Sequence, residues 1–96
     1  MYAQLLIITL GPGTRSAAEK LADQFAPALR TLKGFKGVTF IGDETAGEYG
    51  SLSLWESKED AEAAAAIIRP QLEQAMSGIA KAPLTRRFFE VYEPKA

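Results

Sequence analysis

Residues 51–61 predict a strand that passes, within two residues, into a helix with its own cap, and a large aromatic lies at the junction. Successive strand side chains point to opposite faces, so two leucines oppose two serines and a tryptophan: Leu52 and Leu54 against Ser51, Ser53 and Trp55. Ser57 then offers a hydroxyl that can accept from the free N–H groups of a first helical turn. The junction predicts a domain in which a sheet packs against helices.

The other elements follow from local patterns. Residues 2–10 are almost continuously apolar, which predicts a central strand buried on both faces. A helix is predicted to begin at Ser16, where Glu19 completes a capping box, to kink or break before Pro27 and to end at Lys33 and Gly34. The remaining predicted elements are a hairpin of strands at 35–42 and 49–55, a helix at 58–76 and a strand at 85–92.

This order, β-α-β-β-α-β, predicts a single α+β domain over residues 1–96 with a ferredoxin-like fold. Under the right-handed crossover rule, four antiparallel strands form one sheet and both helices cover one face. We expect that face to carry Leu52, Leu54, Phe89 and Val91. The opposite face, with Trp55, Ile41, Phe88 and Tyr92, is then uncovered and apolar, which predicts a homodimer that packs sheet against sheet.

Composition excludes several kinds of chemistry. The chain has no cysteine and no histidine, which excludes thiolate nucleophiles, histidine bases and metal sites built on either residue, and its acidic residues match no calcium-loop pattern, so no metal site is predicted. Lys and Arg number 11 against 12 Asp and Glu, and their scatter predicts no nucleic-acid partner. The apolar run at residues 5–10 is too short to span a bilayer or to serve as a signal. We therefore expect a cytoplasmic protein with no membrane partner.

Three motifs carry a resemblance to a known family: Gly13-Thr14, the sequence LKGFKG at residues 32–37 and the sequence LWESKEDA at residues 54–61. They resemble the antibiotic biosynthesis monooxygenase-like group of dimeric α+β-barrel proteins, over nearly the whole chain. The resemblance implies oxygenation of a phenol or quinol without a cofactor. The family's haem-degrading branch uses an Asn, a Trp and a His, and this chain has neither Asn nor His. We therefore expect no haem chemistry.

The face that carries Trp55 holds the candidate site. Its predicted ligand-binding residues are Tyr49, Ser51, Ser53, Trp55, Arg86 and Tyr92. Arg86 is also a candidate catalytic group, because a cation can hold a phenolate, and Glu90 is a candidate base if burial raises its pKa. Each has a structural alternative: Trp55 can plug one end of the barrel, the serines can make room at an interface, and Arg86 can pair with Glu90.

Two functions therefore remain open at the level of sequence. The first is a cofactor-independent monooxygenase that acts on a small aromatic phenol or quinol. The second is a non-catalytic dimeric protein that binds a small hydrophobic ligand or serves only as an assembly module. A deep cavity with Arg86 and tyrosine hydroxyls favours the first, and a space filled by side chains favours the second.

Overall fold

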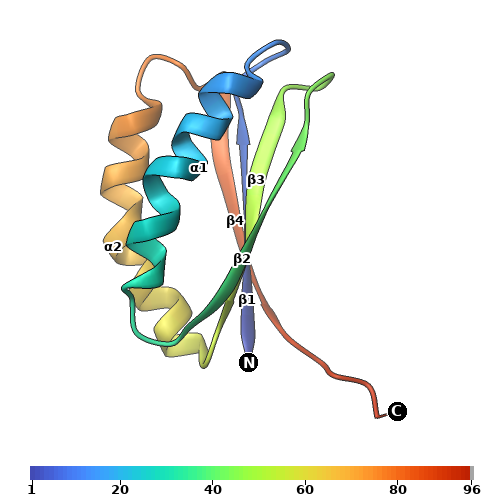
Figure 1. The fold of residues 1–96 in the computed structure, drawn as a ribbon, viewed down its shortest axis with the longest axis vertical. Coiled ribbons are helices and arrows are strands. Elements are labelled where there is room, and N and C mark those ends of the chain that lie inside the picture. Colours follow the sequence, from blue (N-terminus) through green and yellow to red (C-terminus); the bar gives the residue numbers. More distant parts are fainter. Residues whose placement is uncertain (96) are drawn as a thin grey trace.

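One antiparallel sheet carries two helices on one face, and the computed structural model describes this arrangement for residues 1–95 (Figure 1). The strands lie in the order β2-β3-β1-β4. In chain order the elements are β1 (Tyr2–Thr9), α1 (Arg15–Arg30), β2 (Phe35–Asp43), β3 (Glu48–Trp55), α2 (Lys58–Met76) and β4 (Ala82–Glu90). The ferredoxin-like fold and its four antiparallel strands are thus confirmed.

The register of the central strand β1 determines which side chains share a face. Gln4 lies opposite Ser53 of β3 and Phe88 of β4. The next rung towards the C-terminal end of β1 places Leu6 between Ser51 and Arg86. Directly opposite residues of an antiparallel pair point to the same side of the sheet. The odd-numbered residues of β3 and the even-numbered residues of β1 and β4 therefore form one face.

The two helices begin in different ways. The Ser57 hydroxyl accepts a hydrogen bond from the Asp60 backbone N–H at 3.1 Å, as the sequence predicts for α2. The predicted capping box of α1 is wrong. Thr14 precedes the helix and its hydroxyl donates to the Gly11 carbonyl, while Glu19 pairs with Arg15 at 3.1 Å. The helix also continues through Pro27 without a break, and it ends at Arg30 rather than at the predicted Lys33 and Gly34.

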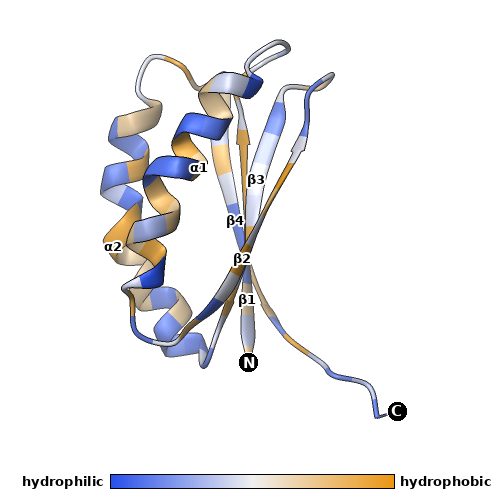
Figure 2. Cartoon of the chain, in the orientation of Figure 1, coloured by the Kyte–Doolittle hydropathy of each residue, from blue (hydrophilic) through white to orange (hydrophobic). Residues whose placement is uncertain are grey.

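The predicted face assignment is also wrong, because the Trp55 face packs against the helices. Trp55 is 1% exposed and belongs to a buried cluster with Ala61 and Ala64 of α2. Leu52, by contrast, is 40% exposed. Alanines let α2 approach the sheet closely enough to cover a large indole, and the small serines of β3 leave space beside that ring. The apolar layer between sheet and helices includes Ile8, Phe25, Ile68 and Leu72, and apolar residues appear on both helices and along the sheet (Figure 2).

The opposite face of the sheet has no helix over it (Figure 1). Ile41, Leu52 and Phe89 are exposed there by 43%, 40% and 37%. Ile41 lies on this face as predicted, whereas Trp55 and Phe88 lie on the other. The sequence therefore correctly predicted an uncovered apolar face, but Trp55 and Phe88 do not belong to it. Within residues 1–95, neither helix has the length and apolarity needed to cross a membrane.

Candidate active site between the sheet and the helices

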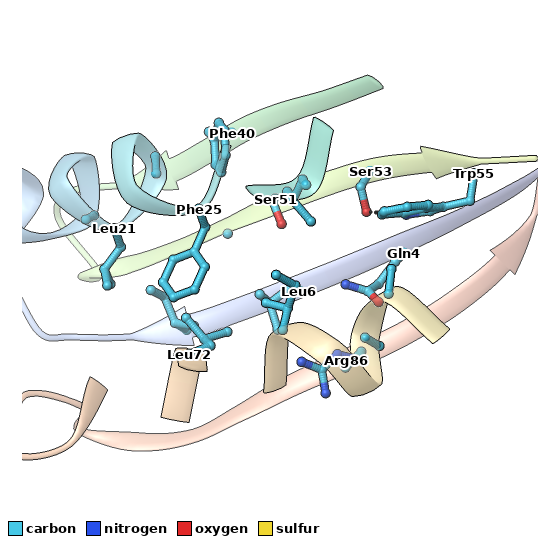
Figure 3. Close-up of a pocket in the computed structure, with 18 residues that line it drawn as sticks. Gln4, Leu6, Leu21, Phe25, Phe40, Ser51, Ser53, Trp55, Leu72 and Arg86 are labelled. Carbon is cyan, nitrogen blue, oxygen red and sulfur yellow. Dashed lines mark hydrogen bonds between the residues drawn. The ribbon is translucent and has the colours of Figure 1, made fainter. Parts of the chain in front are cut away.

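A cavity of about 70 Å³ lies between the sheet and both helices. Its walls are mostly apolar side chains from α1, α2 and β1, among them Leu6, Leu21, Phe25 and Leu72 (Figure 3). Four polar side chains interrupt this lining: Gln4, Ser51, Ser53 and Arg86. An apolar hollow with a few convergent polar groups is the usual form of a small-molecule site.

Trp55 forms one end wall of the cavity. Its ring meets Phe35 edge to face, with centroids 5.4 Å apart and planes at 74°. The indole N–H donates to the Ser53 hydroxyl at 2.9 Å, and Figure 3 shows this bond along the β3 side. Because the N–H is already used, Trp55 offers a ligand its ring rather than a hydrogen bond. The ring both closes the end of the layer and lines the cavity.

Arg86 brings a cation to the opposite side of the cavity, from β4 (Figure 3). Burial lowers the pKa of its guanidinium, the nearby Arg69 lowers it further, and Glu73 partly opposes both effects. Among the described residues no carboxylate forms an ion pair with Arg86, and its buried Nε–H has no hydrogen-bond acceptor. An anion bound beside Arg86 would therefore stabilise its charge.

Gln4 is a site residue that the sequence patterns did not reveal. It is only 8% exposed, and its Oε1 has no donor within residues 1–95. Gln4 was missed because it lies in a strand that is otherwise almost entirely apolar. The available signal was the contrast itself, because Gln4 is an amide within an otherwise apolar central strand, and an amide buried there needs a hydrogen-bond partner.

The structure brings together four of the predicted ligand-binding residues: Ser51, Ser53, Trp55 and Arg86. Tyr49 is buried beside them but lies over Gly42, where an added Cβ would come within 2.6 Å of its ring, and its hydroxyl has no partner in residues 1–95. Tyr92 follows β4 and is 79% exposed, and Glu90 is exposed at the end of that strand. Neither of these two lines the cavity.

An outer groove of about 360 Å³ adjoins the cavity between α1 and the β2–β3 hairpin. Both spaces are lined by Phe40, whose side chain is 41% exposed, and by Ala18, Ala22 and Gly50. Arg15, Glu19 and Glu44 make the outer groove polar. The inner cavity can therefore be reached past Phe40. No cluster of potential metal ligands occurs in the part of the chain that the structure describes.

Comparison with solved structures identifies the fold. No protein-family model matches the sequence, and no curated protein matches it either. A proposed antibiotic biosynthesis monooxygenase from Deinococcus radiodurans superposes with a TM-score of 0.81 at 15% identity, over 100% of this chain and 97% of that one. A Streptomyces coelicolor monooxygenase in complex with nanaomycin D gives 0.78 at 18% identity, over 99% and 90%.

A third structure, SnoaB from Streptomyces nogalater, is a cofactor-independent oxygenase. It matches with a TM-score of 0.73 at 14% identity, over 97% of this chain and 93% of that one. These likenesses extend over nearly the full length of every chain, so they include both helices and all four strands. The protein therefore has the fold of the antibiotic biosynthesis monooxygenases.

Proposed function

We propose that the protein is a cofactor-independent monooxygenase that oxidises a small aromatic phenol or quinol in the cavity between the sheet and the helices. One observation carries the proposal: Arg86, a half-buried cation without an ion-pair partner among residues 1–95, shares an apolar cavity with the Trp55 ring. A flat ring fits against an aromatic wall, and an ionisable oxygen fits the cation. The fold shared with monooxygenase structures supports the same reading.

The chemistry needs only the substrate and oxygen. Arg86 stabilises the phenolate, which lowers the pKa of the bound phenol and increases the fraction of the reactive anion. An electron-rich ring carbon that bears hydrogen, ortho or para to the oxygen, forms a C–O bond with O₂ and, after protonation, gives a hydroperoxide. Loss of water then leaves a quinone carbonyl, so one oxygen atom enters the product and the other leaves in water. The substrate supplies all four electrons.

The size of the cavity restricts the substrate class. An engineered apolar cavity that holds benzene measures roughly 150 Å³, whereas this one measures about 70 Å³. A single ring therefore requires the lining to yield, and Phe40 is placed to do so because it stands half-exposed between cavity and groove. A substrate with several fused rings would have to extend into the outer groove.

Oxygen uptake tests the proposal directly. Single-ring phenols and quinols are supplied to the metal-free protein in an oxygen electrode, with protein-free solutions as the blank. Arg86→Met should reduce kcat/KM by about 10²–10³-fold, because it removes the group that stabilises the anion. Arg30→Met, at the exposed end of α1, is the matched control and should leave the rate unchanged. No uptake above the blank with any substrate, or a rate that Arg86→Met leaves intact, would reject the proposal.

The second candidate is a non-catalytic protein that binds a small hydrophobic ligand or only assembles. It is favoured by the absence of tyrosine hydroxyls from the cavity lining and by the small volume. The single tryptophan distinguishes the two, since Trp55 forms a cavity wall and its fluorescence should report occupancy. Saturable quenching by a phenol without oxygen consumption would identify a binding protein.

A further inference from the structure

We propose that Gln4 and Arg86 together recognise a single aromatic ring bearing a hydroxyl next to an anionic oxygen, that is, the monoanion of a catechol-type ligand. The inference rests on the proposed function in one respect: the cavity is taken as the ligand site. It goes further by naming two contact atoms and the oxygen pattern they select.

The first observation is a buried acceptor. Gln4 is 8% exposed and lines the cavity, and its Oε1 has no donor among residues 1–95. An amide oxygen held away from water without a partner is rare in folded proteins, because desolvation is then uncompensated. A ligand hydroxyl would donate to it.

The second observation is a buried donor nearby. The Nε–H of Arg86 has no acceptor in the described chain, and arginine can only donate. Gln4 lies opposite Phe88 and Leu6 lies opposite Arg86, which makes Gln4 and Arg86 diagonal neighbours on one face of adjacent strands. Figure 3 shows both at the β1–β4 side of the cavity, across from the serines of β3.

Because both residues line the same cavity, a ligand there would need an acceptor for Arg86 and a donor for Gln4. An isolated phenolate satisfies Arg86 and leaves Gln4 without a donor. A ring with neighbouring oxygens satisfies both, since its anionic oxygen accepts from Arg86 and its hydroxyl donates to Gln4. The cavity volume of about 70 Å³ favours one ring over several.

Three single-ring ligands test this pattern through quenching of Trp55 fluorescence, measured without oxygen so that nothing is oxidised. Catechol carries two neighbouring hydroxyls. In 2-methoxyphenol the second oxygen is present but has no proton to donate, and phenol lacks the second oxygen altogether. Catechol should bind about tenfold more tightly than either of the others, the effect of one additional hydrogen bond.

Gln4→Met keeps the length of the side chain and removes the amide. It should abolish the preference for catechol over phenol. Gln74→Met, at an exposed position of α2, is the matched control and should retain the preference. Circular dichroism verifies that each variant is folded, and Gln4→Leu serves as a second variant if Gln4→Met does not fold.

Several outcomes would overturn the inference: no quenching by any ligand, equal binding of catechol and phenol, or a preference that survives Gln4→Met. Equal binding of 2-methoxyphenol and catechol would show that Gln4 presents its NH₂ group to the ligand, which also contradicts the assignment. The proposed function can be rejected independently of this inference. A Gln4-dependent preference for catechol without any oxygen uptake would uphold the recognition site and reject the oxygenase.

Discussion

Arg86 and Arg87 are adjacent in sequence, but their side chains lie on opposite faces of the sheet. The Arg87 guanidinium lies on the uncovered side, 4.7 Å from the centre of the Phe89 ring. Arg86 points into the layer under the helices, where burial lowers its pKa. Strand alternation predicts that the two face apart, but it does not predict which of them is covered. That choice depends on packing against α2, which no local pattern of β4 encodes.

At neutral pH Arg86 is charged in both folded and unfolded protein, and its lowered pKa means that folding disfavours this charge. Arg86→Met should therefore raise the free energy of unfolding slightly, by no more than about 0.5 kcal/mol because solvent screens this partly exposed charge, while it removes activity. Because arginine stays protonated in proteins throughout this range, the gain should be constant between about pH 6 and pH 8. Urea unfolding measures it. A loss of stability would indicate a structural partner for the cation.

Helix α2 shows what local sequence can and cannot predict. Its start at Ser57 and its extent from Lys58 to Met76 follow from a cap and a helical stripe, and both are observed as predicted. The face of β3 that it covers was predicted wrongly, because both faces are apolar and the leucines outweigh the serines. Tertiary complementarity decides the matter, as Ala61 is fully buried in the cluster around Trp55. Gln4 escaped prediction because its strand is otherwise apolar.

The close approach of α2 to Trp55 leads to a paired prediction. Ala61→Leu adds atoms at a position with 0% exposure and should destabilise the protein by about 1–3 kcal/mol through overpacking. Ala63→Leu places the same side chain on the exposed side of the helix and should change stability by no more than about 0.5 kcal/mol. Thermal unfolding followed by near-ultraviolet circular dichroism of Trp55 gives both values. Equal effects would contradict the packing described for this face.

At the scale of the molecule, the two sides of the sheet have different roles. The covered side holds the cavity, and the uncovered side exposes Ile41, Leu52 and Phe89. We propose that a second copy of the chain covers this face, because a contiguous apolar surface over several strands is stabilised by association. The cavity then lies within each subunit, and the dimer protects the sheet rather than forming the pocket.

A charge at the centre of the uncovered face should separate the subunits. Light scattering of the wild-type protein at micromolar concentration should give twice the chain mass of 10.4 kDa. Leu52→Lys should give the monomer mass, because it places an ammonium group in the apolar seam. Ile67→Lys, at a position 51% exposed on α2, should leave the dimer intact. A monomeric wild type would refute this assembly.

The claim that the functional site lies between the sheet and the helices is tested most directly by a crystal structure of the protein grown with catechol in the absence of oxygen. A ring should lie against Trp55, with one oxygen about 3 Å from Arg86 Nε and the other about 3 Å from Gln4 Oε1. A ring bound on the uncovered face, or a cavity that remains closed while the ligand binds elsewhere, would contradict it.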